Sequence, residues 1–453
     1  MSVYLRISIL LCAFITFYSS GHPKEAQKIP YLFTGSFYST NFNYDTNSLY
    51  SSLKSGGLIL PVEYRQIFIE AFKSRDLPFD PDKQSLIIWT NSGNIDECLS
   101  NDINAVSLLP WNMVKPWERA LRWNGALPWD RTNSLQPYSL MLPGRPDDPL
   151  FLREEVTVIA AGGTVVLSRG IMRLIERTSD VDAPWKGIGS IFMEADASFV
   201  NLKSPLVDRY IPGTNLLRLY GKSGYAAGLS NAHISAVSIS GNHIGDAGDE
   251  GISNTMEALS HNGILYSGAG TGPDEACGGV FFEANNLKIG FIGVNWNPST
   301  ARTASKSGVF GISRLSQEFL EYVKKAKSVS DFLIVLPNWG WEYRTKPIAQ
   351  QVYWGRRLVE SGADIVIGDQ AHWVQNSAFY RGKFISYCLG NLVFDQLEHR
   401  ETREGVIEKF IVYGKNLMQI EIIPVYLGRD KIVRPADDPA VMGSIFSKVL
   451  NYR

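Results

Sequence analysis

Apolar segments of strand length alternate with amphipathic helical segments over most of the chain beyond residue 155. Nine stretches rich in Val, Ile, Leu and Phe are typical of buried strands: residues 156–160, 197–202, 234–239, 287–294, 332–336, 364–367, 384–389, 409–413 and 418–425. Strands that alternate with helices form sheets whose faces the helices cover. This pattern constrains the fold more than any other feature, and it predicts an α/β protein.

Two of the intervening helices can be placed from their spacing and end signals. The first has apolar or small residues on one face and a glycine stop, at Ile252, Thr255, Met256, Leu259 and Gly263. The second opens near a proline and ends near a glycine, with its inner positions at Ile348, Val352, Leu358 and Val359. Both helices are expected to cover a sheet.

A segment rich in turn-forming residues divides the chain. The eight residues 142–149 contain three Pro, one Gly and two Asp, which predicts a linker over 142–152. Upstream, residues 24–141 combine a helical segment at 61–72 with strand-like segments at 86–89 and 105–111. This layout resembles one α/β lobe of an extracytoplasmic solute-binding protein, with its Trp residues expected to pack inside the lobe rather than to face a ligand.

The first 21 residues have the pattern of a secretion signal. Residues 7–17 are almost wholly apolar, too short to span a bilayer, and Ser19, Ser20 and Gly21 supply small side chains for cleavage. An uncleaved anchor and a lipoprotein are the alternatives. We expect an exported protein that is periplasmic, extracellular or associated with the cell envelope, with membrane association only through its N-terminus.

Charge and cysteine content exclude several classes of protein. The 44 Lys and Arg nearly balance the 45 Asp and Glu, so we expect no nucleic-acid partner. Loss of the signal would remove one of the four Cys and leave Cys98, Cys277 and Cys388, an odd number without metal-ligand spacing. Cys388 lies in an apolar run, which favours a buried thiol.

Polar residues follow directly on five of the predicted strands. The five junctions centre on Gly163-Thr164-Val165, Asn201-Leu202-Lys203, Gly241-Asn242-His243, Asn338-Trp339-Gly340 and Gly368-Asp369-Gln370-Ala371-His372. Arg169, Asp246 and Glu342 lie just beyond three of them. Because ligand sites in layered α/β folds form where strands end, we expect these side chains to share one site.

Two longer stretches carry a family resemblance. Residues 238–246 read SISGNHIGD and residues 382–396 read GKFISYCLGNLVFDQ, supported by 266–270 and 401–404. With these, residues 153–430 resemble the capsule-synthesis CapA family, which includes the PgsA component of poly-γ-glutamate synthesis and is related to calcineurin-like metallophosphoesterases. The resemblance implies a four-layer α/β/β/α sandwich, with residues 431–453 as a C-terminal tail that packs on it.

The chain departs from the family pattern at metal-ligand positions. The resemblance implies Asp at position 164, Glu at 203, and His at 338, 369 and 370, whereas this chain has Thr164, Lys203, Asn338, Asp369 and Gln370. Two divalent ions need bridging anions and several further ligands, and an ammonium repels them. We therefore expect no dinuclear centre, and no cofactor beyond at most one divalent metal ion bound by Asp369, His372 and Asn242.

The remaining site residues are assigned by type and position. His243, Asn242 and Asp246 are the candidate catalytic group, although His243 serves equally well as a structural residue that holds its loop. Cationic and polar side chains expected to bind substrate are Arg169, Asn201, Lys203, Glu342, Asn391 and Arg403. Arg binds carboxylates through two parallel hydrogen bonds, but a surface ion pair is the ordinary alternative for Arg169 and Arg403.

Three functions remain open on this evidence. The first is an envelope component that acts with other biosynthesis proteins to make or export an anionic polymer, polysaccharide or polyglutamate, as a pseudo-metallophosphoesterase. The second is a metal-dependent phosphoesterase or γ-glutamyl hydrolase with a mononuclear site and His243 as general acid. The third is an extracytoplasmic solute-binding module formed by residues 24–141. We favour the first and leave enzyme status open.

Overall fold

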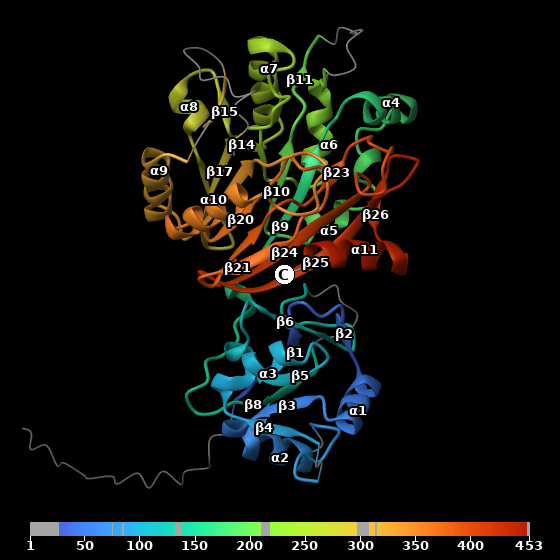
Figure 1. Cartoon of the computed structure of the whole chain (residues 1–453), viewed down its shortest axis with the longest axis vertical. Helices are drawn as coiled ribbons and strands as arrows, with labels where there is room; N and C mark the ends of the chain where they lie inside the picture. The colour runs from blue at the N-terminus through green and yellow to red at the C-terminus, as the bar shows by residue number, and fades with distance from the viewer. Residues whose placement is uncertain are drawn as a thin grey trace, which may run out of the picture.

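The computed structural model describes residues 27–74, 76–83, 86–131, 138–209, 218–296, 308–312 and 315–450. Figure 1 shows two parts, a large α/β sandwich above and a smaller N-terminal lobe, in blue and cyan, below it. The proposed signal segment, residues 1–21, lies outside the described residues. Within the described ranges, no helix has both the length and the apolar character needed to cross a membrane.

The first sheet of the sandwich has the strand order β14-β13-β10-β9-β24-β25-β26, and β23 also pairs with β9. Parallel pairing joins β14, β13, β10, β9 and β23, and antiparallel pairing joins β9 to β24 and then β25 and β26. The strands are β9 (Val156–Val165), β10 (Ala197–Leu202), β13 (Ala236–Ser238), β14 (Leu265–Ser267), β23 (Asn391–Val393), β24 (Glu404–Tyr413), β25 (Asn416–Leu427) and β26 (Val433–Pro435).

The second sheet has the order β16-β17-β19-β20-β22-β21, with its four inner strands parallel. They are β16 (Val280–Ala284), β17 (Leu287–Asn295), β19 (Phe332–Asn338), β20 (Ile365–Ile367), β21 (Ser377–Tyr380) and β22 (Lys383–Ser386). Two small pairs lie outside both sheets: β11 (Leu206–Val207) with β12 (Gly221–Lys222), and β15 (Ala269–Gly270) with β18 (Gly308–Val309).

The two sheets pack face to face, and helices cover their outer faces (Figure 1). Between the sheets, Phe199 of β10 stacks on Phe291 of β17 with ring centroids 4.8 Å apart. Outside the first sheet lie α4 (Arg169–Thr178), α5 (Gly189–Met193), α6 (Ala226–Asn231) and α7 (Gly248–His261), and outside the second lie α9 (Gln317–Ser328) and α10 (Ala349–Glu360). The predicted four-layer α/β/β/α sandwich is confirmed.

The sequence of the central strand explains its depth in the molecule. All ten residues of β9 are buried, and its segment Val-Thr-Val-Ile-Ala-Ala-Gly-Gly-Thr-Val is almost continuously apolar, as is typical of strands covered on both faces. A Cβ atom on Gly163 would lie 2.0 Å from the carbonyl oxygen of Gly390. Glycine at this position therefore permits the loop before β23 to approach β9.

The N-terminal lobe is built on a mixed sheet of order β4-β3-β5-β1-β6, with β8 also paired to β1. Its strands are β1 (Lys28–Ser36), β3 (Leu58–Pro61), β4 (Ile88–Thr90), β5 (Val106–Pro110), β6 (Glu118–Ala120) and β8 (Met141–Pro143), and a separate pair joins β2 (Asn43–Tyr44) to β7 (Arg122–Trp123). Three helices flank them: α1 (Thr46–Ser55), α2 (Arg65–Lys73) and α3 (Ile95–Asn101). Trp111, Trp123 and Trp129 lie in the lobe's core.

The linker expected over residues 142–152 needs a correction at its start. Leu142 and Pro143 belong to β8 and pair with Ile29 and Lys28 of β1. Proline lacks the amide hydrogen that a central strand needs, but it is tolerated in an edge strand such as this one. The composition of the segment predicted a break in regular structure, and it gave no sign that the first residues pair with β1 as a short edge strand.

The lobe and the sandwich share one hydrophobic core. Val158, Ile411 and Met418 of the sandwich are buried in the same cluster as the lobe's strands. The side chain of Gln419 accepts a hydrogen bond from the amide of Ala120 (2.9 Å) and donates one to the carbonyl of Lys115 (2.8 Å). The C-terminal helix α11 (Pro439–Val449) packs Ile445 and Phe446 into the core between the sheets.

Candidate functional site

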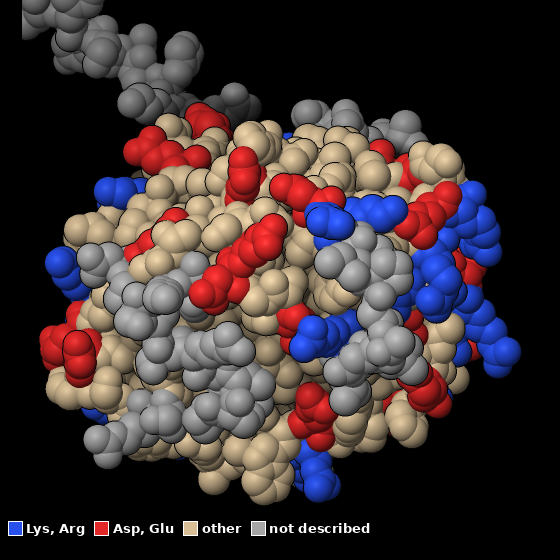
Figure 2. All heavy atoms as spheres, turned by 90° about the horizontal axis from the view of Figure 1, so that it is seen from above, with Lys and Arg blue, Asp and Glu red and all other residues tan. Residues whose placement is uncertain are grey.

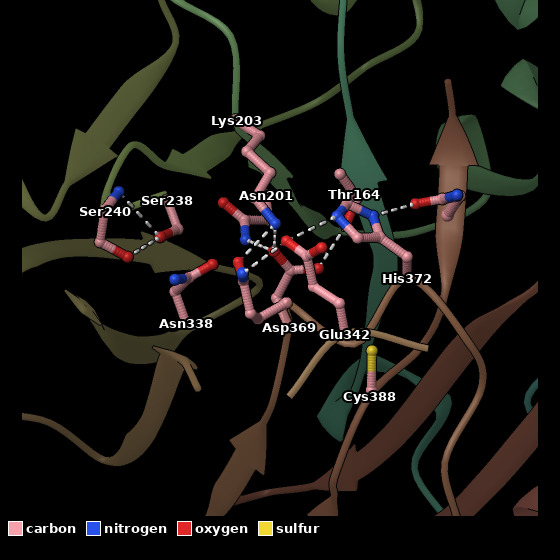
Figure 3. Close-up of polar contacts among 12 residues, drawn as sticks. Thr164, Asn201, Lys203, Ser238, Ser240, Asn338, Glu342, Asp369, His372 and Cys388 are labelled. Carbon is pink, nitrogen blue, oxygen red and sulfur yellow. Dashed lines mark hydrogen bonds and ion pairs between the residues drawn. The ribbon is translucent and has the colours of Figure 1, made fainter. Parts of the chain in front are cut away.

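The predicted polar junctions meet where strands of the two sheets end. Thr164 is near the end of β9, and Asn201 is near the end of β10. Asn338 is the last residue of β19, and it forms a β-bridge with Asp369 just beyond β20. In Figure 3 these side chains face one another together with Lys203 and His372. These polar junctions therefore converge at the edge shared by the two sheets, where the sequence led us to expect a site.

Asp369 is the centre of this cluster, and both of its carboxylate oxygens accept hydrogen bonds. The hydroxyl of Thr164 donates to Oδ1, and the amide Nδ2 of Asn201 donates to Oδ2 (Figure 3). Asp369 is 3% exposed. Because each carboxylate oxygen already has a protein partner, Asp369 is held by its neighbours.

Lys203 fills the space beside Asp369. Its side chain is 0% exposed, and its Nζ donates to Oε1 of Gln370 (2.7 Å) and lies 3.7 Å from Oδ2 of Asp369. Gln370 in turn donates from Nε2 to Oε1 of Glu342 (3.1 Å). A Cβ atom on Gly241 would lie 2.9 Å from Cγ of Lys203, so glycine there leaves room for the lysine. A buried ammonium without such partners would be strongly destabilising.

His372 is buried against the same cluster. Its Nδ1 forms a 2.8 Å hydrogen bond with Oδ1 of Asn391, and its Nε2 lies 4.0 Å from Oε1 of Glu342. Burial, and secondly the positive charge of Lys203, lower the pKa of His372 well below its usual value of 6.5. His372 is therefore neutral at pH 7, and the ring of Tyr343 stacks on it at 6.0 Å.

The candidate catalytic group forms a separate pair on its loop. Nδ1 of His243 lies 2.8 Å from Oδ2 of Asp246, with both side chains partly exposed. The same Oδ2 accepts a hydrogen bond from the amide of Leu219 (2.7 Å). The positive form of His243 disfavours protonation of His372, which relates the two rings electrostatically. Asp246 orients His243, and this arrangement fits both the general-acid and the structural assignment.

Three buried asparagine oxygens from the predicted strand-end junctions have no hydrogen-bond donor within the described part of the chain. They are Oδ1 of Asn201, Asn242 and Asn338. Asn201 and Asn338 both adjoin Asp369, the first through a hydrogen bond and the second through its β-bridge. Unpaired buried acceptors are unfavourable unless a positive charge or a bound group compensates them. The ammonium of Lys203 supplies such a charge.

The two candidate arginines are held by other contacts. Nε and Nη2 of Arg169 donate to Oδ1 of Asp395 (3.0 and 2.5 Å), and its guanidinium lies 5.1 Å from the ring of Phe394, which also contacts His372. Arg403 donates from Nε to the carbonyl of Leu427 (2.9 Å) and stacks over Tyr426 at 4.4 Å. Arg169 thus adjoins the site through Phe394, whereas the contacts of Arg403 are with the end of β25.

Several residues at the site were not singled out by their sequence pattern. Asp395 anchors Arg169, and Tyr343 covers His372. Cys388, for which the sequence predicted a buried thiol, lies buried beneath the cluster (Figure 3). Burial, and secondly the charge of Asp369, raise the pKa of Cys388 to about 12, so its thiol is unreactive. Asp395 lies within one of the two family-specific stretches, which was the available signal. Nothing in the sequence indicated that Gln370 and His372 adopt positive φ values of 102° and 59°.

The donor set does not fit a pair of divalent ions. Across the residues that the structure describes, no group of three or more His, Cys, Asp or Glu side chains is placed to hold a metal ion. At the site, the carboxylate of Asp369 is engaged by Thr164 and Asn201, the ammonium of Lys203 lies beside it, and the carboxylate of Glu342 accepts from Gln370. Two cations would need bridging anions at this point.

Comparison with known proteins decides the family. The model of the family described as bacterial capsule synthesis protein PGA_cap matches residues 158–396, more than half of the chain. This chain belongs to that family. It is 24% identical over 294 residues to the PGA biosynthesis protein CapA of Bacillus subtilis (strain 168), covering 64% of this chain and 77% of that protein. It is 23% identical over 286 residues to the capsule biosynthesis protein CapA of Bacillus anthracis, covering 61% and 69%.

More distant likenesses add little to this assignment. A probable polyglutamine synthesis accessory protein of Mycobacterium tuberculosis is 27% identical over 216 residues, which cover 43% of this chain and 56% of that protein. A 5'-nucleotidase precursor from Thermus thermophilus is 10% identical over 64% of this chain and 58% of its own, with a TM-score of 0.36, which is too low to support an argument. The PGA_cap family and its named relatives support a capsule- or polyglutamate-related role.

Proposed function

We propose that this chain is a non-catalytic component of the machinery that makes or exports an anionic surface polymer, such as a capsular polysaccharide or poly-γ-glutamate. In this proposal the protein is exported, acts at the cell envelope beside other biosynthesis proteins, and has no dinuclear metal centre. The observation that carries the proposal is the ion pair between the buried ammonium of Lys203 and the carboxylate of Asp369 (3.7 Å).

The physical argument concerns what would have to change for hydrolysis through two metals. Lys203 would have to leave a pocket in which it is 0% exposed, and Asp369 would have to release the hydrogen bonds from Thr164 and Asn201. Removing one member of a buried ion pair costs about 3–5 kcal/mol. The present arrangement is therefore a stable alternative to a metal centre, with an internal ammonium in place of cations.

A complementation experiment tests the proposal in a host that makes poly-γ-glutamate. Deletion of the host's own family member is expected to lower surface polymer, and this chain is expected to restore it. The variants His243→Ala and His372→Ala should restore polymer as well as the wild type does, because no turnover is required. If the wild type restores polymer and both variants fail despite normal protein levels, the protein acts as a catalyst and the proposal is wrong.

A mononuclear metal-dependent hydrolase is the second candidate, and one observation favours it. The three unpaired amide oxygens of Asn201, Asn242 and Asn338 are hard donors of the kind that Mg²⁺, Ca²⁺ and Mn²⁺ accept. The His243–Asp246 pair would then supply a general acid. Purified protein should be assayed on phosphodiester and γ-glutamyl substrates with and without chelator. One tightly bound metal ion and chelator-sensitive hydrolysis would favour this second function.

A further inference from the structure

Three arginines recur along one helix that begins beside the candidate site. Arg173 and Arg177 are four residues apart on α4, which places them on roughly the same side about 6 Å apart, and Arg169, whose φ is 48°, is the first residue of the helix. The opposite side of α4 is apolar and buries Ile171, Leu174 and Ile175 in the core. The sequence of α4 therefore directs Arg173 and Arg177 outward, and Arg169, which is paired with Asp395, lies at the inner end of the row.

A fourth cation joins this row from another part of the chain. Lys431 lies in the turn between β25 and β26, and a Cβ atom on Gly170 would lie 2.7 Å from its Cε. The side chain of Lys431 thus crosses the first turn of α4. Arg173, Arg177 and Lys431 line a hollow of about 380 Å³ together with Leu174 and Glu176. Figure 2 shows Lys and Arg side chains gathered on the right of the view, the side on which α4 lies in Figure 1.

The cations of the hollow are free for a ligand. Within the described part of the chain, the side chains of Arg173, Arg177 and Lys431 have no hydrogen-bond or ion-pair partner. The carboxylate of Glu176 is already neutralised by Lys222, whose Nζ lies 2.7 Å from Oε1. The whole chain has a formal net charge of −1, so this concentration of unpaired positive charge is a local feature.

From this arrangement we infer that α4 and Lys431 form a docking track for a linear polycarboxylate, and that the track leads to the candidate site. This inference rests on the proposed function and assigns it a surface. Each exposed cation gains little from a single anion, about 1 kcal/mol or less, so a small anion would bind weakly. A chain of repeated carboxylates contacts several cations at once, and each later contact is intramolecular. Arginine also suits carboxylates because its planar group donates two parallel hydrogen bonds.

The direction of the track follows from its inner end. Arg169 lies 5.1 Å from the ring of Phe394, whose centroid is 5.6 Å from that of His372. Arg169 is itself held by Asp395, so it sets the position of the track and the unpaired cations beyond it provide the binding charge. A polymer that follows Arg177, Arg173 and Lys431 would therefore reach Arg169, whose side chain is 31% exposed and which adjoins the buried His372 through the ring of Phe394.

The test measures binding of fluorescent poly-γ-glutamate to the full chain by anisotropy at several salt concentrations. The variant Arg173→Gln/Arg177→Gln is expected to bind about tenfold more weakly at low salt, equivalent to about 1.4 kcal/mol, with a shallower salt dependence. Lys54→Gln/Lys73→Gln, which removes two exposed cations from the N-terminal lobe, is the charge-matched control and should bind like the wild type. Circular dichroism should show unchanged melting, because the substituted arginines make no hydrogen bond or ion pair within the described part of the chain.

The outcomes separate the track from the proposed function. If the wild type binds polymer and the α4 variant binds equally well, the track is wrong while the proposed function stands. If the wild type does not bind poly-γ-glutamate at all, the docking track is wrong. Any version of the proposed function in which this chain itself binds the polymer is then wrong as well. Equal affinity for duplex DNA or for vesicles of anionic lipid would overturn the assignment to a polycarboxylate, and tighter binding of poly-γ-glutamate than of either supports it.

Discussion

The ammonium of Lys203 lies 3.7 Å from Oδ2 of Asp369, and the two side chains are only 0% and 5% exposed. An ion pair at this depth loses nearly all of its hydration, so each charge depends on the other. Around it, the hydroxyl of Thr164 and the amide of Asn201 complete the hydrogen bonding of the carboxylate. Thr164, Lys203 and Asp369, three positions at which the sequence led us to expect other residues from the family resemblance, thus contact one another as a set.

Replacement of Lys203 by methionine should destabilise the protein by about 3–5 kcal/mol, because the carboxylate of Asp369 would remain buried without its cation. Urea unfolding at pH 7 measures this loss. The double variant Lys203→Met/Asp369→Asn should recover most of it, since neither charge is then left unpaired. Lys222→Met, which breaks the exposed pair with Glu176, is the control and should cost about 1 kcal/mol or less. A loss below about 1 kcal/mol for Lys203→Met would show that the buried carboxylate of Asp369 does not depend on the ammonium of Lys203.

Divalent metal binding should respond to charge at the same pocket. Isothermal titration of the wild type with Mn²⁺ or Zn²⁺ is expected to show no pair of tight sites, because the ammonium of Lys203 lies beside the carboxylate of Asp369. The variant Thr164→Asp/Lys203→Glu should acquire tight metal binding, because it adds two anions and removes one cation. Lys222→Glu makes the same lysine-to-glutamate exchange at an exposed position and should not acquire tight metal binding. Tight binding of two metal equivalents by the wild type would show that the ammonium of Lys203 does not exclude metal ions.

Glu408 predicts a dependence of stability on pH. Its side chain links the sheets by accepting a hydrogen bond from Ser386 (3.0 Å), and burial raises its pKa from 4.5 to about 8. Between pH 4.5 and 8 the folded state holds a proton that the unfolded state has lost, so stability contributed by this group is complete below 4.5 and declines as pH rises to 8. Glu408→Gln removes this decline.

Urea unfolding of both proteins from pH 5 to pH 8 checks the pH prediction. The unfolding free energy of Glu408→Gln relative to the wild type should increase with pH by up to about 1.4 kcal/mol per unit. Burial also raises the pKa of Glu118, to about 9, but Glu118 is present in both proteins and cancels in the difference. A difference that stays constant with pH would show that Glu408 is ionised in the folded protein.

Two glycines of one loop give a matched test of the space around Lys203. Gly241→Ala would place a Cβ 2.9 Å from Cγ and 3.2 Å from Cα of Lys203, whereas a Cβ on Gly245 meets nothing within 4 Å. Gly241→Ala should therefore lower the unfolding free energy by about 1–3 kcal/mol, as overpacking does, and Gly245→Ala should leave it nearly unchanged. Thermal melting compares them. Equal melting temperatures would mean that the lysine can move aside.

The strand pattern predicted an α/β protein because the inner strands are buried on both faces, and the four-layer sandwich was implied by the family resemblance. β10 has the predicted bounds, and β17 and β25 differ from prediction by only a few residues. β23 and β16 were not predicted, since β23 has only three residues and β16 alternates between half-buried and exposed positions at a sheet edge. A continuous apolar run in a sequence predicts a buried strand. A short edge strand has no such run, because its pairing depends on the neighbouring strand.

The convergence of the polar junctions was predictable, but the contacts among their side chains were not. Polar residues after buried strands identified the edge at which Thr164 and Asp369 lie. Their hydrogen bond joins positions 205 residues apart, and no local pattern specifies such a pair. Arg403 has the residue type of a carboxylate ligand, yet its Nε is engaged by the carbonyl of Leu427. Residue type indicates what a side chain can bind, and the fold decides what it contacts.

The core shared by the lobe and the sandwich has a consequence for any ligand held between them. Two-lobed binding proteins close by hinge rotation of one lobe against the other. Here such a rotation would expose Met418 and Ile411 to water and separate Gln419 from Ala120 and Lys115. The two parts therefore keep a fixed separation, and a ligand at their boundary would meet a preformed surface rather than a closing one.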